Sequence, residues 1–318
     1  GEARGEYLLL LSPSSQIYSG DWLDELLNHA LRPEVGIVGA KVLDKAGKII
    51  HAGMVLGVDS SAGAAFEGED AQGAGYMHRL QVVQNWSAVS GDCLMVRKAA
   101  FDSVGGLDET TFGDSLADLD LCLKVGAEGY LVVWTPYASI VRGLVTTDDS
   151  VLTDERQREV REAFCQNWLA RLINDPAYNP SLSLMKANFA LDTGLTHGWN
   201  PLCSRSLPSV LGLPINASAV GHYRVVQPFL ELEAAGKIVG RFTYESPSVV
   251  DFERMNPDVV IFQLRHAPAS VDDMLRLTKF SNARSIFEID DYILETPQKN
   301  THARNKSLDI REQLQRGI

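Results

Sequence analysis

Two aspartates separated by one residue, Asp118 and Asp120, are the strongest candidates for catalysis in this sequence. A carboxylate within hydrogen-bond reach of a hydroxyl can take its proton if the carboxyl pKa suits the transfer. A helix is predicted to begin near Leu116, and in its first turn the two side chains point in different directions. One aspartate would then serve catalysis, and the other would cap the helix or orient the catalytic one. The spacing alone also allows a structural role for both, because helix N-termini favour acidic residues.

A loop at residues 87–92 places polar side chains beside a glycine, ahead of a predicted strand. It contains Ser87, Ala88, Gly91 and Asp92. Gly91 permits close approach of the backbone, and Asp92 can accept hydrogen bonds from the hydroxyls of a ligand. A plain strand-entry turn would use the same residue types, so the loop is ambiguous without further information.

The elements that must position these residues alternate between strands and helices. In the first half of the chain, strands are predicted at 7–11, 35–43, 48–57, 94–96 and 130–134, and helices at 22–31, from 116, and at 155–173. Asp21 is predicted to cap the first helix, and Asp154 with Gln157 to form a capping box on the last. Residues 59–75 are rich in Gly, Ala, Ser and Asp, which predicts a surface loop.

A change of pattern marks the second half. Residues 176–206 are rich in Pro, Asn, Ser and Gly, and a domain boundary is predicted there. Beyond it strand and helix alternate over residues 209–214, 223–235, 259–264, 271–280 and 285–289. This rhythm predicts a parallel sheet of Rossmann type, and the fold class of the whole chain is α/β.

The composition fits a globular protein of about two domains. The net charge of −12 and the lack of clustered Lys and Arg exclude a nucleic-acid binder. The four cysteines are widely spaced, which favours reduced thiols in the cytosol over a zinc site or a disulfide framework. No stretch approaches the roughly 20 apolar residues that span a bilayer, and the N-terminus lacks a signal-peptide pattern.

Four short motifs occur in a specific order in the first half. They read NWSAVSGDCLM at 85–95, VGGLDE at 104–109, ADLDLC at 117–122 and WTPYA at 134–138. Their order and spacing resemble the acceptor-side half of family-2 glycosyltransferases of the GT-A fold, especially those that make bacterial surface polysaccharides. The resemblance covers residue 1 to about residue 190.

The resemblance implies an inverting transfer from a nucleotide-sugar donor to a saccharide or lipid-linked saccharide acceptor. Asp118 falls where that family has its catalytic base. The loop with Ser87, Ala88, Gly91 and Asp92 corresponds to the border of the donor and acceptor sugars. Asp108 and Glu109 fall in the acceptor-site loop, and Asp120 is a further candidate for substrate binding. His51 is expected to be structural.

Two departures from the family pattern concern the metal ion. The family closes the strand equivalent to 7–11 with a metal-binding Asp, but this sequence reads Ser12-Pro13-Ser14 there. The family also has a metal-binding His at the position where this chain has Arg142. Hydroxyls are poor substitutes for anionic oxygens as Mg²⁺ or Mn²⁺ ligands. We therefore expect no metal ligands among these residues and hypothesise that Arg142 supplies the positive charge facing the diphosphate. A catalytically inactive scaffold or sugar-binding module is the alternative.

The second half resembles the N-terminal part of a GT-B glycosyltransferase, on residues 219–228, 256–263 and 287–292. The residues singled out for binding in this half are Gly221, Arg224, Asp290 and Asp291. Gly221 would approach an anionic group with Arg224 as its cation. The two aspartates would follow a strand at the carboxyl edge of the sheet. Ordinary loop acids and a surface arginine would look the same.

The domain organisation expected from these resemblances has three parts. Residues 1–190 form the GT-A acceptor half, residues 191–206 a linker and residues 207–318 the N-terminal Rossmann-like part of a GT-B domain. The family's nucleotide-binding half would precede residue 6, so the chain is either a fragment or completed in trans, and we expect a fragment. The expected location is the cytoplasm, at the inner face of the membrane if the chain associates peripherally with it or with a partner in polysaccharide assembly.

Overall fold

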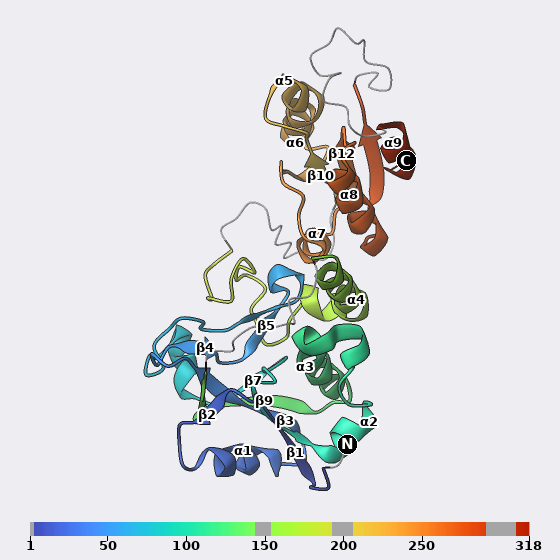
Figure 1. Cartoon of the computed structure of the whole chain (residues 1–318). Coiled ribbons are helices and arrows are strands. Elements are labelled where there is room, and N and C mark those ends of the chain that lie inside the picture. The colour runs from blue at the N-terminus through green and yellow to red at the C-terminus, as the bar shows by residue number, and fades with distance from the viewer. Residues whose placement is uncertain (1–2, 144–153, 193–205, 291–309, 318) are drawn as a thin grey trace. The chain divides into compact units, whose positions relative to one another are not determined.

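The computed structural model describes residues 3–143, 154–192, 206–290 and 310–317. The chain divides into two compact units, residues 1–193 and residues 194–318. Each unit contains a sheet of its own (Figure 1).

The first unit is built on a mixed sheet. Its main path through the described residues runs β1-β8-β3-β9-β2, with β4 paired to β3 and β7 paired to β9. The strands are β1 (Tyr7–Leu11), β2 (Ser15–Ile17), β3 (Val35–Leu43), β4 (Ile49–His51), β7 (Gln84–Trp86), β8 (Cys93–Arg97) and β9 (Leu131–Arg142). β3 and β9 run parallel, whereas β8 is antiparallel to both β1 and β3.

β3 is buried along its whole length because both faces of the sheet are covered. Helix α1 (Trp22–Ala30) packs its buried stripe, which includes Leu26, against one face. On the other face, Gly36 lies against Val125 of α3 (Glu109–Ala127), and Figure 1 shows the two helices on opposite sides of the sheet. A strand covered on both faces reads as a continuous apolar run, as residues 35–43 do.

Helix α3 carries both candidate aspartates and is interrupted near its start. Gly113 has φ 56° and ψ −153°, which is not a helical conformation. A helical turn that was not predicted, beginning at Glu109, precedes Gly113. The part that carries Asp118 starts after Gly113, close to the predicted start near Leu116, so its helical phase is set there.

The other elements of the first unit flank this sheet. They are β5 (Met54–Leu56), β6 (Ala62–Ala64), the 3₁₀ turns η1 (Val58–Ser60) and η2 (Tyr76–Gln81), and the helices α2 (Lys98–Ser103) and α4 (Asp154–Ile173). β5 and β6 form a separate antiparallel pair. The single strand predicted at 48–57 is thus two strands, β4 and β5, in different sheets. The chain turns between them at Gly53, whose φ is 97°.

Two capping predictions have different outcomes. Asp21 precedes α1 but makes no side-chain capping hydrogen bond, so that prediction is wrong. The side chain of Asp154 lies outside the described residues, and the capping box predicted for α4 stays a prediction.

The second unit contains a parallel sheet, as predicted. Its strands are β10 (Ser209–Leu213), β11 (Val239–Phe242), β12 (Val259–Gln263) and β13 (Arg284–Glu288). In the described residues their order is β11-β10-β12-β13, and every pair is parallel. The order leaves β10 between β11 and β12, so the chain crosses from one side of β10 to the other.

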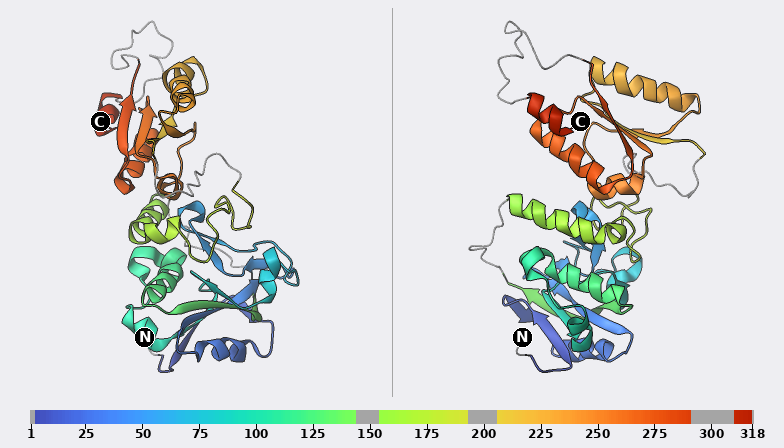
Figure 2. Two further views of the ribbon diagram at one scale, coloured as in Figure 1. Left: turned by 180° about the vertical axis from the view of Figure 1, so that it is seen from behind. Right: turned by 90° about the vertical axis from the view of Figure 1, so that its right-hand side faces the viewer.

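Helices lie on both sides of this parallel sheet, with α6 on one side and α8 on the other (Figure 2). They are α5 (Ala219–Gly221), the π-helical turn η3 (His222–Val226), α6 (Gln227–Ala234), α7 (Val249–Met255), α8 (Pro268–Phe280) and α9 (Ile310–Gly317). The helix predicted at 223–235 contains the π turn η3 just before Pro228. Proline has no N–H to donate to a helical hydrogen bond, and the wider π turn lies where that bond would be needed. β11 and α7 were not predicted. No helix in the described parts of the chain has the length and apolar character needed to cross a membrane.

Candidate active site

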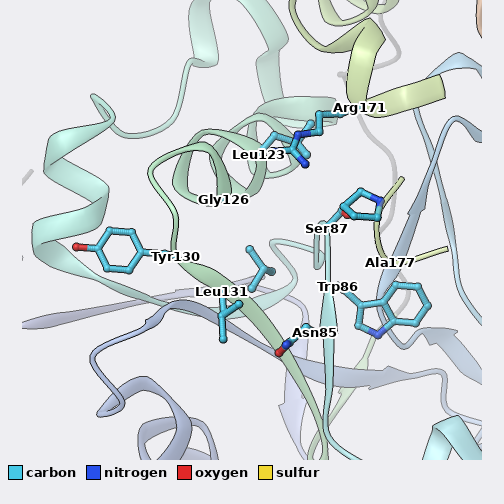
Figure 3. Close-up of a pocket in the computed structure, with 11 residues that line it drawn as sticks. Asn85, Trp86, Ser87, Leu123, Gly126, Tyr130, Leu131, Arg171 and Ala177 are labelled. Atoms are coloured by element: carbon cyan, nitrogen blue, oxygen red, sulfur yellow. The ribbon is translucent and has the colours of Figure 1, made fainter. Parts of the chain in front are cut away.

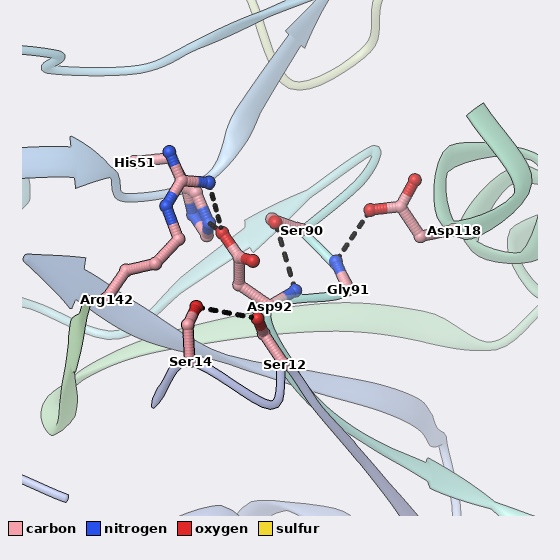
Figure 4. Close-up of polar contacts among 8 residues, drawn as sticks. All are labelled: Ser12, Ser14, His51, Ser90, Gly91, Asp92, Asp118 and Arg142. Atoms are coloured by element: carbon pink, nitrogen blue, oxygen red, sulfur yellow. Dashed lines mark hydrogen bonds and ion pairs between the residues drawn. The ribbon is translucent and has the colours of Figure 1, made fainter. Parts of the chain in front are cut away.

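A cleft of about 590 Å³ opens in the first unit, and its walls come from segments far apart in the sequence. The segment after β1, the end of β4, the loop before β8, the N-terminal part of α3 and the end of β9 all contribute. The polar or charged residues that line it are Ser12, His51, Glu67, Ser90, Asp92, Glu109, Ser115, Asp118 and Arg142. Figure 4 shows the central contacts.

Asp118 lines this cleft, and both of its carboxylate oxygens accept backbone hydrogen bonds. The N–H of Gly91 donates to Oδ2 at 2.6 Å (Figure 4). The N–H of Leu119 donates to Oδ1 at 2.8 Å. Burial raises the pKa of Asp118, and the two N–H groups and His51 offset only part of that effect. A fixed carboxylate whose pKa is raised toward neutrality suits a proton acceptor.

Gly91 has a specific geometric reason to be glycine. A Cβ atom at this position would lie 3.0 Å from Cβ and 3.1 Å from Oδ2 of Asp118. The missing side chain lets the loop before β8 approach α3 closely enough to form the hydrogen bond to Asp118.

Asp92 joins two basic side chains at the other end of the cleft. Arg142 donates from Nη1 to Oδ2 of Asp92 at 2.8 Å, and Nε2 of His51 lies 3.4 Å from the same oxygen (Figure 4). Burial by itself would raise the pKa of Asp92, but His51 and Arg142 outweigh it and hold that pKa below its usual value. Asp92 is therefore ionised near neutral pH, and it fixes Arg142 at the cleft.

The two departures from the family's metal-binding pattern meet at this same end. Ser15 pairs with Arg142 between β2 and β9, and the N–H of Gly143 donates to the carbonyl of Ser14 at 2.9 Å. The hydroxyls of Ser12 and Ser14 lie 3.2 Å apart. The hydroxyls and the guanidinium thus belong to one local surface.

The residues at this end do not fit a Mg²⁺ or Mn²⁺ ion. Such ions prefer several anionic or carbonyl oxygens. The carboxylate here, Asp92, is already bound by Arg142, and the nearby serine oxygens are uncharged. Within the described ranges, no group of three or more His, Cys, Asp or Glu side chains is arranged to hold a metal.

The structure does not bring Asp120 to the cleft. Its side chain is buried, with Oδ1 accepting a hydrogen bond of 2.9 Å from Nε1 of Trp168 and Oδ2 lying 2.9 Å from Nζ of Lys124. Both oxygens are used inside the protein, where Asp120 connects α3 to α4. This geometry gives Asp120 a structural role in place of the expected contact with substrate.

Of the two candidates in the predicted acceptor-site loop, Asp108 and Glu109, only Glu109 lines the cleft. Asp108 is the N-cap of α3 and accepts a hydrogen bond of 3.0 Å from the N–H of Thr111. It is not among the residues that line the cleft, whereas Glu109 is. Glu109 is therefore the better placed of the two to contact a ligand.

Ser87 and Ala88 also lie away from this cleft. The Ser87 hydroxyl donates to Oδ1 of Asp175, and the buried Ala88 accepts a hydrogen bond of 3.0 Å from the N–H of Met54. Ser87 instead lines a second cavity of about 260 Å³, together with Trp86 and Arg171 (Figure 3). The structure supports a role for Ser87 and Ala88 in holding the loop in place, rather than in contacting a ligand in the larger cleft.

Of the four binding residues predicted in the second unit, two have internal contacts, one is exposed and one lies outside the described residues. A Cβ on Gly221 would lie 1.9 Å from the carbonyl oxygen of Asn216, so its lack of a side chain serves packing. Arg224 donates from Nε to Oε1 of Glu288 at 2.7 Å. Asp290 is exposed after β13, and Asp291 lies outside the described residues.

Sequence reasoning missed a polar network at the carboxyl ends of β12 and β13. The side-chain amide of Gln263 donates to Oε2 of Glu288 at 2.9 Å, and its oxygen accepts from the N–H of Ile215 at 3.1 Å. Polar residues closing two apolar strands are the signal that could have identified it, because ligands of such sheets bind at this edge. Glu288 also holds Arg224, so the network restrains the predicted cation.

Sequence reasoning also missed the position of His51, which was expected to be structural. It is 4% exposed and lines the cleft beside Asp92 and Arg142. Its sequence neighbours Ala52 and Gly53 give no signal of chemistry. Only the pairing of β4 with the sheet brings His51 to this place.

No protein-family model matches the chain. It is 38% identical over 195 residues to the uncharacterized protein y4gI of Sinorhizobium fredii, covering 60% of this chain and 22% of that protein. It is 34% identical over 198 residues to the O-antigen biosynthesis protein RfbC of Myxococcus xanthus, covering 61% of this chain and 15% of that protein. The chain therefore spans less than a quarter of the length of either relative.

A third relative is the N-acetylglucosaminyl-diphospho-decaprenol L-rhamnosyltransferase of Mycobacterium tuberculosis, 29% identical over 146 residues, or 43% of this chain and 46% of that protein. Among solved structures, a mannosyltransferase from Pyrobaculum calidifontis, in complex with GDP-Man and Mn²⁺, matches 56% of this chain and 42% of that chain at 15% identity. Its TM-score of 0.31 is too low to transfer a fold or a site. The names of the second and third relatives support the predicted resemblance to glycosyltransferases of polysaccharide synthesis.

Proposed function

We propose that the first unit belongs to a glycosyltransferase that moves a sugar from a nucleotide-sugar donor to a hydroxyl of a saccharide or lipid-linked saccharide acceptor. The pathway we infer is bacterial polysaccharide synthesis, such as that of O-antigen or capsule. The observation that carries the proposal is the carboxylate of Asp118, which lines a cleft and is oriented by the N–H groups of Gly91 and Leu119.

Asp118 acts as the general base in this mechanism. The acceptor oxygen attacks the anomeric carbon while its proton passes to the Asp118 carboxylate. The bond between that carbon and the diphosphate oxygen breaks, and the diphosphate leaves with the electron pair. Attack from the side opposite the leaving group inverts the configuration. Because burial raises the pKa of Asp118, the carboxylate is a stronger proton acceptor than an exposed aspartate.

Arg142 stabilises the leaving diphosphate. Its guanidinium is a permanent cation whose planar donors match phosphate oxygens. One of its nitrogens, Nη1, is bound to Asp92, and its side chain is 37% exposed at the cleft. The other donors of the guanidinium can therefore reach a ligand while Asp92 keeps the side chain in place.

The domain roles are part of the same proposal. Residues 1–190 would be the acceptor half of a GT-A domain, residues 191–206 a linker and residues 207–318 the N-terminal part of a GT-B domain. The all-parallel order β11-β10-β12-β13 supports the last assignment. We propose a cytoplasmic location, with contact to the membrane or its assembly machinery made through the acceptor or a partner.

A transfer assay tests this function. The protein, with any sequence that flanks residues 1–318, is incubated with radiolabelled nucleotide-sugars and lipid-linked saccharides, and labelled acceptor is measured. Asp118→Asn should reduce transfer by about 10²-fold or more, because it removes the general base. Asp21→Asn is the matched control, since Asp21 is exposed and its side chain makes no capping hydrogen bond. Equal transfer by wild type and Asp118→Asn would reject the mechanism.

A second candidate function is a sugar-binding scaffold without transferase activity. The serine hydroxyls and Arg142, which stand where the family has metal ligands, favour it. This reading predicts that donor and acceptor saccharides bind to the protein while neither transfer nor donor hydrolysis is detectable. Isothermal titration of both ligands beside the transfer assay separates the two functions.

A further inference from the structure

We propose that His51 binds a phosphate oxygen of the donor's diphosphate, together with Arg142. The inference rests on the proposed transferase function and adds a ligand-binding residue to its cleft.

The imidazole of His51 is buried without satisfying its nitrogens. Its side chain is 6% exposed, and Nε2 has only the 3.4 Å contact with Oδ2 of Asp92. In the described parts of the chain neither Nδ1 nor Nε2 makes a hydrogen bond of good geometry. A buried polar group without a partner is destabilising, and most such groups in native proteins are paired. The position therefore calls for a partner that the described residues do not supply.

The surroundings of His51 indicate that this partner is an anion. Nε2 of His51 and Nη1 of Arg142 both approach Oδ2 of Asp92, at 3.4 Å and 2.8 Å (Figure 4). One carboxylate thus contacts two basic side chains. A phosphate oxygen supplies the hydrogen-bond acceptor that the imidazole lacks.

The location within the cleft agrees with a leaving diphosphate. Ser12, His51 and Arg142 all line the cleft, and the short loop before β8 separates them from Asp118. Gly91 of this loop contacts Asp118, and the next residue, Asp92, contacts His51 and Arg142. The proton acceptor and the basic pair therefore lie on two sides of one loop, as a displacement with separate attacking and leaving oxygens requires.

Inorganic pyrophosphate is the probe for this site, because it carries the diphosphate chemistry without a base or a sugar. Its binding to the 318-residue chain is measured by isothermal titration for the wild type, His51→Phe, His51→Gln and Arg142→Gln. Phenylalanine keeps the ring shape and removes both nitrogens. The wild type should bind with saturation, and His51→Phe should weaken binding about tenfold or more, as expected for a lost hydrogen bond to a charged group.

His29→Phe is the matched control, because His29 lies in α1 and does not line the cleft. It should bind pyrophosphate as the wild type does. Thermal unfolding verifies that each variant is folded. If His51→Phe does not fold, His51→Gln gives the comparison, since it keeps one N–H donor and should weaken binding by less than Arg142→Gln does.

Two results would overturn the inference. One is an absence of saturable pyrophosphate binding to the wild type. The other is wild-type affinity in a folded His51 variant when Arg142→Gln has lost binding. Sugar transfer that is undiminished in His51→Phe would remove the role of His51 and leave the proposed function intact. Pyrophosphate binding that depends on His51, in a protein that transfers no sugar, would keep the phosphate contact and remove the transferase.

Discussion

The backbone N–H of Gly91 donates a hydrogen bond of 2.6 Å to Oδ2 of Asp118. Gly91 lies in the loop that enters β8, and Asp118 lies in α3, so this bond connects two walls of the cleft. Because Oδ1 accepts from the N–H of Leu119, the carboxylate has one fixed orientation. The orientation of the candidate base therefore depends on a residue without a side chain.

Replacing Gly91 with alanine should impair transfer without unfolding the protein. The new Cβ would lie 3.0 Å from Cβ and 3.1 Å from Oδ2 of Asp118, which forces the loop and the carboxylate apart. We expect kcat to fall about tenfold or more, because a small displacement of a catalytic group is costly. Gly126→Ala is the control, since no atom lies within 4 Å of its added Cβ. Steady-state kinetics showing equal kcat for both variants would contradict the positioning role.

The pH dependence of transfer should show an acid limb due to Asp118. The base must be deprotonated, and burial raises its pKa, so activity is lost on acidification at a higher pH than for an ordinary aspartate of pKa about 3.9. Asp92 should not contribute to this limb, because His51 and Arg142 hold its pKa low. The measurement is kcat/KM across the acid range. An acid limb at or below the usual aspartate range would exclude Asp118 as the base.

Chelation of divalent ions should leave transfer intact. The residues where the family binds its metal are hydroxyls and Arg142, so EDTA has no resident ion to remove there. Arg142→Ala should instead lower kcat about 10²-fold, the usual cost of losing one donor to a developing charge. Arg32→Ala, which removes an exposed arginine paired with Glu34, serves as the control. Strict dependence on Mn²⁺ would overturn this view of Arg142.

Asp175 should be required for stability rather than for chemistry. Its buried carboxylate accepts hydrogen bonds from the Ser87 hydroxyl and from the N–H groups of Leu56 and Ala177. Asp175→Ala leaves these donors without an acceptor and should lower the free energy of unfolding by about 2 kcal/mol or more. Ser87→Ala should cost about 1 kcal/mol, and the exposed Asp21→Ala less than about 0.5 kcal/mol. Urea denaturation measures all three, and an unchanged midpoint for Asp175→Ala would contradict the assignment.

The sequence predicted those parts of the fold whose signal is local. β3 is buried on both faces and reads as an unbroken apolar run, and α1 has one apolar stripe, so both were identified. β11 is short and only partly buried, which leaves no alternation to detect. β4 and β5 are divided at Gly53, which lies against the ring of Trp86, a contact that no local pattern reveals.

The site was less predictable because its geometry is long-range. Asp118 and Asp120 have the same type and similar surroundings in the sequence, and only the phase of α3 after Gly113 decides which one faces the cleft. His51 and Asp92 meet only because β4 and β8 both pair with β3. A lone histidine followed by Ala52 carries no record of that arrangement.

β9 makes the cleft depend on pairing between distant parts of the chain. Its residues Leu131–Val141 pair with β3 from far away in the sequence, and its last residue is Arg142. Such non-local pairing forms slowly because the intervening chain must first be ordered. If β9 were unpaired, Asp92 would lack its guanidinium partner. Affinity for anions should therefore require the pairing of β9 with β3, and it can report whether that pairing has formed.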